Sequence, residues 1–246
     1  MGNVLGIIAE YNPFHNGHLH HLNESNKITN SDYTIAIMSG NFTQRGEVSI
    51  VDKWEKTRMA ISNGVDLVIE LPTLYAISSA ENFASGAIKI LNSLGIVDFL
   101  SFGSESNDIS LLDDIANVLA FEPAQYKTLL SHELARGESF PKARENAVMM
   151  YLNNVRRFAN VLSSPNNILG IEYLKSLKRQ KSKIKPITIK REGSKYNDTK
   201  IPRGSRFASA TAIRTMIKNK KPINKVVPFE TYELLERQAK LGRIIP

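Results

Sequence analysis

The sequence has no cysteine among its 246 residues and only one tryptophan. Without thiols, the chain cannot carry a disulfide framework, an iron–sulfur cluster, a thiolate zinc site or a cysteine nucleophile. It has no run of 18 uninterrupted apolar residues, so we expect no membrane-spanning helix. Residues 1–7 lack the basic region and long apolar run of a signal peptide. We therefore expect a soluble, cytoplasmic protein with a sizeable core and no membrane partner.

Positive charge is scarce in the first half of the chain and concentrated in the second. Residues 1–125 hold 6 Lys and Arg against 15 Asp and Glu, whereas residues 126–246 hold 26 against 9. Because accumulated positive charge attracts phosphates, the region from Lys175 to Lys225 predicts an RNA or another polyphosphate partner. The alternative is an ordinary solvated face, or counter-charge for the acidic half. Few aromatic residues interrupt this region, which argues against a base-stacking platform.

Apolar runs bounded by turn residues predict buried strands at 4–9, 33–38, 66–71, 97–102 and 185–190. Between them, apolar residues at three- and four-residue spacing predict helices at 52–65 and 80–94. Strands that alternate with helices indicate right-handed crossovers. The fold class we expect is therefore α/β, with a doubly wound, Rossmann-like parallel sheet.

The second half of the chain is predicted to be mostly helical and basic. We expect helices at 110–120, 123–136, 141–158 and 167–180, a basic loop at 191–207, and helices at 209–220 and 229–241. This pattern suggests a catalytic domain over 1–205, with a helical insertion at about 109–181. A basic helical segment over 206–246 would follow it.

The segment from Glu10 to His18 directly follows the first predicted strand. Ligands of parallel sheets bind at the carboxyl ends of strands, where the next helix offers free backbone N–H groups to a phosphate. His15 and His18 can both face that phosphate across one helical turn. There they would stabilise the charge that builds up when an α-phosphate is attacked in line. Gly17 would let a base or phosphate approach closely.

Other interpretations of these histidines stay open. Taken alone, His15 or His18 would be a structural or surface histidine. His20 and His21 are expected to be surface or helix-face residues, with a metal cluster as the alternative. The position of the motif after the first strand, with Asn12-Pro13-Phe14 before it, favours the phosphate site.

Residues 6–18 resemble the nucleotide site of the HIGH superfamily of nucleotidyl transferases and class I aminoacyl-tRNA synthetases. More closely, the chain resembles the bacterial tRNA(Met) cytidine acetate ligase family. The segments that support this are 38–46, 101–105, 164–170 and 208–214. The resemblance implies that acetate is activated by ATP to acetyl-adenylate. The acetyl group would then pass to the wobble cytidine of elongator tRNA(Met), giving N4-acetylcytidine.

The resemblance also implies residue roles. His15 and His18 would be the catalytic residues, and Gly103 would let the adenosine ring lie against backbone. Either Asn166 or Asn167 would hydrogen-bond the nucleotide, unless both serve to cap a helix. Arg191 would bind phosphate or be a surface residue, and Ser209 and Thr211 would meet the β- and γ-phosphates unless Ser209 is an ordinary N-cap. The complete expected ATP-binding set is Ile7, Ile8, Ala9, Glu10, Tyr11, Asn12, Pro13, Phe14, His15, Asn16, Gly17, His18, His20, Gly103, Asn166, Asn167, Arg191, Ser209 and Thr211.

The expected tRNA-binding residues are basic side chains, namely Lys178, Arg179, Lys181, Lys183, Lys218, Lys220 and Lys221. ATP would be a co-substrate accompanied by Mg²⁺, which usually binds through substrate phosphates, and no protein metal ligands are expected. Asn41, Gln44 and Arg45 would meet acetate or the cytidine, or form a surface loop, and no step is assigned to them. The oligomeric state stays open.

Family members continue into a further carboxy-terminal region, whereas this sequence stops at Pro246. We therefore expect an intact adenylation site with reduced tRNA affinity or anticodon selection. Two rival functions remain at this point. One is an adenylyltransferase for a small phosphorylated metabolite, and the other is a non-catalytic RNA-binding protein.

Overall fold

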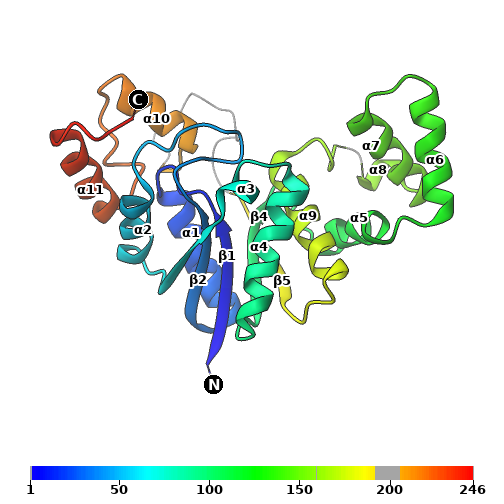
Figure 1. Cartoon of the computed structure of the whole chain (residues 1–246), viewed down its shortest axis with the longest axis horizontal. Coiled ribbons are helices and arrows are strands. Elements are labelled where there is room, and N and C mark those ends of the chain that lie inside the picture. The colour runs from blue at the N-terminus through cyan, green and yellow to red at the C-terminus, as the bar shows by residue number, and fades with distance from the viewer. Residues whose placement is uncertain (1, 159, 192–205, 246) are drawn as a thin grey trace.

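A five-stranded sheet with the strand order β3-β2-β1-β4-β5 forms the centre of the molecule (Figure 1). The computed structural model describes residues 2–158, 160–191 and 206–245. All neighbouring strands pair in parallel. The strands are β1 Asn3–Ala9, β2 Ser31–Ser39, β3 Leu67–Leu71, β4 Phe99–Ser104 and β5 Lys185–Lys190. The order reverses direction at β1 and β4, so the predicted doubly wound parallel sheet is confirmed and a crevice opens at the carboxyl ends of these two strands.

The helices match most of the expected ranges. They are α1 Asn16–Thr29, α2 Lys53–Ser62, α3 Thr73–Ala76, α4 Ala80–Leu94, α5 Ile109–Phe121, α6 Ala124–Ala135, α7 Phe140–Tyr151, α8 Val155–Phe158, α9 Pro165–Arg179, α10 Ala210–Lys218 and α11 Phe229–Lys240. The single helix predicted over 141–158 is wrong, because Asn153 adopts a left-handed φ of 50° and separates α7 from α8. The short helix α3 was not predicted.

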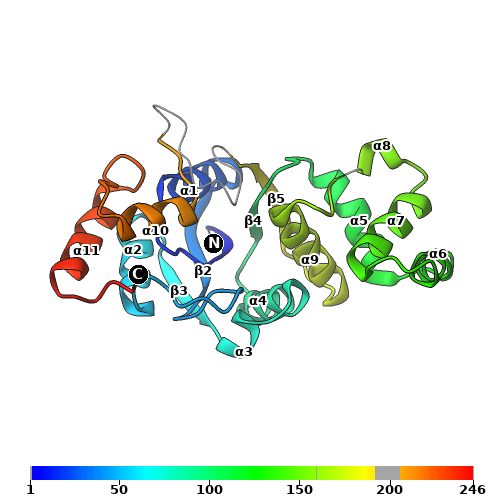
Figure 2. The same cartoon turned by 90° about the horizontal axis from the view of Figure 1, so that it is seen from above.

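Alternating side chains of the central strands divide the core into two layers. Val4, Ile35 and Ile37 pack with α4, α5 and α9 on one face. Leu5 and Ala36 pack with α1, α2, α10 and α11 on the other face. Figure 2 shows α1 and α4 on opposite sides of the sheet. Because successive strand residues point to opposite faces, near-continuous apolar runs are what a sheet covered on both sides requires.

The segment after residue 205 belongs to the same core as the first strand. Asn16 donates from its backbone N to Val226 O at 3.1 Å and from Nδ2 to Lys225 O at 3.0 Å. Ile213 and Leu235 are buried in the layer that contains Leu5. The start of α1 is therefore held by the carboxy-terminal part of the chain. Most of the loop predicted over 191–207, and the proposed domain boundary at 205, lie outside the described residues.

Helices α6, α7 and α8 form a separate lobe beside α5 and α9, at the right of Figure 1. Arg144 of α7 reaches Glu172 of α9 at 3.0 Å, and the buried Lys175 pairs with the same carboxylate at 3.0 Å. A buried carboxylate is tolerated when it is paired and hydrogen-bonded, as Glu172 is here. None of the described helices is long and apolar enough to cross a membrane.

The close contact between α9 and β4 gives a test of the fold. A Cβ added at Gly170 would lie 2.5 Å from the Phe102 ring. Glycine to alanine inside a helix normally stabilises by about 1 kcal/mol, but overpacking a core costs about 1–3 kcal/mol. We expect Gly170→Ala to lower the free energy of unfolding in urea, and Phe102→Leu to relieve that loss in the double variant. A more stable Gly170→Ala protein would contradict this packing.

Candidate active site

A cavity of about 310 Å³ lies at the carboxyl ends of β1, β4 and β5. Its lining includes fifteen of the residues expected to bind ATP: Ile7, Ile8, Ala9, Glu10, Tyr11, Asn12, His15, Gly17, His18, His20, Gly103, Asn166, Arg191, Ser209 and Thr211. Pro13, Phe14, Asn16 and Asn167 do not line it. Phe14 is instead fully buried in the core, and Asn16 holds the carboxy-terminal segment.

His15 and His18 cap the start of α1 with their side chains. His15 Nδ1 accepts from Gly17 N at 3.1 Å and from His18 N at 3.3 Å. His18 Nδ1 accepts in return from His15 N at 3.2 Å, and the two rings stack with centroids 3.6 Å apart. This is the reciprocal arrangement of a capping box, made by two imidazoles. Since an accepting Nδ1 carries no hydrogen, the proton of each neutral ring sits on Nε2.

The surroundings keep both imidazoles neutral. Burial lowers the pKa of His15 to about 3, and the Arg191 guanidinium adds to the effect. Burial also lowers the pKa of His18 well below its usual range, with His15 and Arg191 contributing. At neutral pH each ring is therefore a fixed hydrogen-bond donor through Nε2 and not a cation.

Gly17 lines the cavity and lies against the His15 ring. A Cβ at this position would lie 3.0 Å from Cε1 and 3.1 Å from Nδ1 of His15. The glycine therefore leaves room for the His15 ring to fold back onto the helix start.

Asn166 and Asn167, between which the sequence left the nucleotide contact open, make different hydrogen bonds. Asn166 Oδ1 accepts from Arg191 Nη1 at 3.0 Å, and both residues line the cavity. Asn167 Oδ1 accepts from the backbone N of Glu105 at 3.0 Å and of Ser106 at 3.1 Å, so it braces the loop after β4. The carboxylate of Glu105 accepts from both Asn166 N and Asn167 N and caps α9. Of this pair, Asn166 lines the cavity and Asn167 does not.

Gly103 and the start of α10 complete the cavity on two sides. A Cβ at Gly103 would lie 3.1 Å from Arg191 Cγ, so glycine allows the arginine to lie across the end of β4. Ser209 Oγ accepts from Ala212 N at 3.0 Å, which is the N-cap bond considered as the alternative, while Ser209 also lines the cavity. Thr211 lies in the first turn of α10 and lines the cavity as well.

The loop after β2 contributes residues to which the sequence assigned no step. Gln44 and Arg45 line the cavity, and Gln44 N donates to Glu10 Oε1 at 2.6 Å. Asn41 has a structural role, because its Oδ1 accepts from Lys53 N at the start of α2 at 2.8 Å. The loop therefore covers the end of β1.

Several lining residues were missed at the sequence level, among them His21, Thr43, Glu47, Tyr173, Lys190, Phe207 and Arg214. Arg214 stands in the segment 208–214 that carries the resemblance, but no role was assigned to it. Its Nη1 donates to Asn12 O at 3.0 Å and its Nη2 to Glu47 Oε2 at 3.2 Å. Thr43 likewise stands in the segment 38–46 that carries the resemblance, without an assigned role. No local pattern marks Tyr173, which only the folding of the chain brings to the cavity.

His20 and His21 each contact a side chain from a distant part of the chain. His20 faces the Phe207 ring with centroids 5.6 Å apart, and His21 Nε2 lies 3.0 Å from Ser101 Oγ. His20 and His21 both lie in α1, are partly exposed and line the cavity. Across residues 2–158, 160–191 and 206–245, no group of three or more His, Asp or Glu side chains is placed to hold a metal ion.

The residues expected to bind tRNA fall into two places. Lys178 pairs with Asp113 of α5 at 2.9 Å, and Arg179 pairs with Glu81 of α4 at 2.8 Å. With Lys181 and Lys183, they lie at the end of α9 away from the cavity, since the other end of this helix carries Asn166. Lys178 and Arg179 thus join helices to one another.

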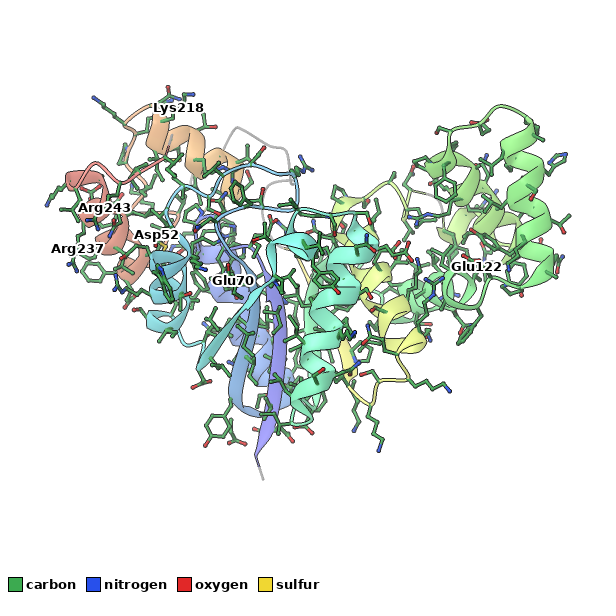
Figure 3. All side chains as sticks on the ribbon, in the orientation of Figure 1. Asp52, Glu70, Glu122, Lys218, Arg237 and Arg243 are labelled. Atoms are coloured by element: carbon green, nitrogen blue, oxygen red, sulfur yellow. The ribbon has the colours of Figure 1, made fainter. Side chains whose placement is uncertain are left out.

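Lys218 is the last residue of α10, the helix whose first turn lines the cavity, and Lys220 and Lys221 follow shortly after it; all three are exposed. Figure 3 places Lys218 at the top of the molecule, on the side of the carboxyl ends of the strands. These lysines therefore share a side of the molecule with the cavity.

Such a sheet, with a paired-histidine cap after its first strand, defines a nucleotidyl transferase. The model of the HIGH Nucleotidyl Transferase family matches residues 2–246, and the chain belongs to this family.

Within this family the chain is similar to tRNA(Met) cytidine acetate ligases. It is 52% identical over 242 residues to that of Caldanaerobacter subterraneus subsp. tengcongensis, covering 98% of this chain and 60% of the relative. It is 56% identical over 214 residues to that of Acetivibrio thermocellus, covering 87% and 51%. The chain thus spans no more than about 60% of the length of these relatives.

Solved structures agree with this assignment. Thermotoga maritima TmcAL without ligand has a TM-score of 0.94 at 43% identity, covering 98% of this chain and 58% of that chain. The same protein bound with alpha-thio ATP has a TM-score of 0.91 at 42% identity, covering 98% and 57%. The resemblance stated from the sequence is confirmed.

The lowered pKa of His15 gives a prediction about stability. Below pH 6.5 the unfolded chain binds a proton at this histidine while the folded chain does not, so folding stability falls as the pH falls from about 7.5 to 4. The contribution is about 1.4 kcal/mol per pH unit. His15→Asn keeps an N-cap acceptor but removes this titration. We expect urea denaturation to show a shallower fall for the variant, and parallel profiles would contradict the assignment.

Proposed function

We propose that the chain activates acetate with ATP and transfers the acetyl group to the wobble cytidine of elongator tRNA(Met), giving N4-acetylcytidine. The observation that carries the proposal is the pair of neutral, Nε2-protonated imidazoles at the start of α1, in a cavity at the carboxyl ends of β1 and β4. The names of the relatives, and the ATP analogue bound to the similar Thermotoga maritima protein, support the choice of reaction.

In the first step, a carboxylate oxygen of acetate attacks the α-phosphorus of ATP. The bond from that phosphorus to the oxygen bridging to the β-phosphate breaks, and pyrophosphate leaves with the electron pair. His15 and His18 donate Nε2–H bonds to the phosphate oxygens on which charge builds up. Because both rings are already fixed by backbone N–H groups, they need no reorganisation during the reaction.

The rest of the cavity suits the remaining parts of ATP. The first turn of α10, with Ser209 and Thr211, offers hydroxyls and backbone N–H groups for the β- and γ-phosphates. Arg191, held by Asn166, supplies positive charge on the other side. Because Gly103 has no side chain, the adenosine ring would lie flat against the backbone at this position. Mg²⁺, when bound, would offset triphosphate charge through phosphate oxygens, in keeping with a cavity without clustered protein ligands among the described residues.

In the second step, the exocyclic amine of the cytidine attacks the carbonyl carbon of acetyl-adenylate. The bond from that carbon to the phosphate oxygen breaks, AMP leaves, and the amine loses one proton to solvent. The exposed Lys218, Lys220 and Lys221 lie on the cavity side of the molecule and provide charge for tRNA phosphates. Lys181 and Lys183 lie on the far side, where they would serve only a tRNA that wraps around the sheet.

The first measurement is exchange of labelled pyrophosphate into ATP, with and without acetate, followed by nucleoside analysis of elongator tRNA(Met). Acetate-dependent exchange and N4-acetylcytidine are expected. Exchange without acetylated tRNA would show that this chain activates acetate but does not carry out the transfer step. Exchange that requires a phosphorylated metabolite in place of acetate would favour the adenylyltransferase, and RNA binding without exchange would favour the non-catalytic protein.

His18 can be tested with two variants that separate catalysis from helix capping. His18→Gln retains the capping box, in which glutamine at the third helical position is favourable, whereas His18→Ala loses it. We expect both variants to slow acetate-dependent exchange by about 10²-fold, while only His18→Ala lowers the melting temperature. A His18→Gln protein as active as the wild type would rule out the ring donor.

The surface lysines can be tested through salt dependence. Replacing Lys218, Lys220 and Lys221 by Gln is expected to weaken tRNA binding. The slope of log affinity against log salt should fall by about 0.7–0.9 for each phosphate that is no longer neutralised. Acetate-dependent exchange should stay unchanged. The matched control is Lys181→Gln with Lys183→Gln, on the far side of the sheet. An effect of the control equal to that of the lysines on the cavity side would refute the placement.

A further inference from the structure

The loop after β2 is fastened to the loop after β1 by side-chain hydrogen bonds. Ile50 N donates to Asn12 Oδ1 at 2.8 Å, and Gln44 N donates to Glu10 Oε1 at 2.6 Å. The fully buried Lys56 fixes the start of the same loop, because its Nζ donates to Ser39 O at 2.8 Å and Gly40 O at 2.9 Å. The two loops therefore hold a defined position relative to each other at the cavity.

Two buried polar atoms of these loops have no hydrogen-bond partner within the described part of the chain. They are Nδ2 of Asn12 and Oγ1 of Thr43, in residues that are only 3% and 4% exposed. Both residues line the cavity. Other unpartnered buried atoms occur in Ser39, Glu55 and Ser106, but these residues do not line it. Because burying an unpaired polar group costs free energy, a pair of them at a binding cavity indicates that a ligand completes their bonds.

The donor set defines the chemistry of that ligand. Asn12 Oδ1 is already occupied by Ile50 N, so the amide orientation is fixed and Nδ2 can only donate. The Thr43 hydroxyl, which has no partner among the described residues, is the other donor. Since two donors call for two acceptor oxygens, a carboxylate is the group that matches them.

The charge around this part of the cavity favours a small anion over a polyphosphate. Glu10, Arg45 and Glu47 lie in the loops after β1 and β2, and Arg214 is bonded to both loops, so these four charges balance. The other charged lining residues, Lys190 and Arg191, lie at the end of β5. Arg214 is joined both to Asn12 O at 3.0 Å and to Glu47 Oε2 at 3.2 Å. A triphosphate would meet two carboxylates here, whereas a single negative charge is accommodated beside the guanidinium.

We propose that Asn12 and Thr43 bind the carboxylate of the acyl substrate and position it for attack on the α-phosphate. The proposal rests on the function proposed above. It assigns Asn12 to acetate, whereas the sequence placed this residue in the ATP-binding set, and it gives Thr43 a role that the sequence alone did not assign. Neither residue takes part in proton transfer, so both are substrate-binding residues.

Thr43→Val is the central variant, because valine keeps the shape and removes only the hydroxyl. The backbone hydrogen bonds of this residue, from its N to Glu47 O and from Gly46 N to its O, stay in place. The matched control is Ser106→Ala, which removes another unpartnered buried hydroxyl away from the cavity. Neither variant should lower the melting temperature, since neither loses a hydrogen bond. Asn12→Asp is the second variant: it keeps the acceptor for Ile50 N and replaces the donor with a negative oxygen.

The test measures binding of ¹³C-labelled acetate by NMR in the presence of α,β-methylene-ATP, and the KM for acetate in pyrophosphate exchange. We expect Thr43→Val to weaken acetate binding and raise this KM by about tenfold, and Asn12→Asp to abolish binding. The KM for ATP should stay unchanged in Thr43→Val, and Ser106→Ala should match the wild type.

The outcomes separate this proposal from the proposed function. Acetate binding that depends on Thr43, in a chain without exchange activity, would support the carboxylate site and refute the activation reaction. Exchange with an unchanged KM for acetate in Thr43→Val would refute the site and leave the reaction standing. A wild-type chain that binds no acetate would refute both.

Discussion

The hydrogen bonds from the backbone N–H groups at the start of α1 to the Nδ1 atoms of His15 and His18 are the constraint on which the site depends. In these bonds side chains, and not a ligand, cap the first turn of the helix. The same bonds place the proton of each ring on Nε2. Burial and the charge of Arg191 then hold the pKa of His15 far below neutrality. Helix capping, tautomer and charge state therefore follow from one local arrangement, and it exists only because Gly17 leaves room for the His15 ring.

In the rest of the cavity, hydrogen bonds between separate loops and helices hold several of the residues that line it. Asn167 and Glu105 fix the loop after β4 and the start of α9, so that Asn166 can hold Arg191. Arg214 ties the loop after β1 to Glu47 in the loop after β2. In contrast, Asn12 and Thr43 keep polar atoms at the cavity that have no partner within the described residues. The loops are therefore joined by hydrogen bonds, while the unpartnered atoms of Asn12 and Thr43 belong to residues that line the cavity.

Much of the fold could be predicted because its signals are local. The runs at 4–9 and 185–190 became β1 and β5 with nearly the same bounds, and the helix at 80–94 became α4. The split of the helix predicted over 141–158 was missed, because the residues around Asn153 do not indicate its left-handed conformation. Among the expected tRNA-binding residues, Lys178 and Arg179 look like free charges in the sequence. They are ion-paired to α5 and α4, which are distant in the chain.

The sequence by itself determined the class of fold and the location of the site. Strand and helix periodicity, and the histidine motif after the first strand, are properties of short segments and need no knowledge of distant contacts. Only the tertiary structure showed that Asn166 but not Asn167 lines the cavity, placed Thr43 and Arg214 there, and showed which buried polar atoms of the described residues lack partners. The physical reason is that hydrogen-bond satisfaction and burial depend on residues far apart in the chain, which meet only when the sheet and its loops have folded.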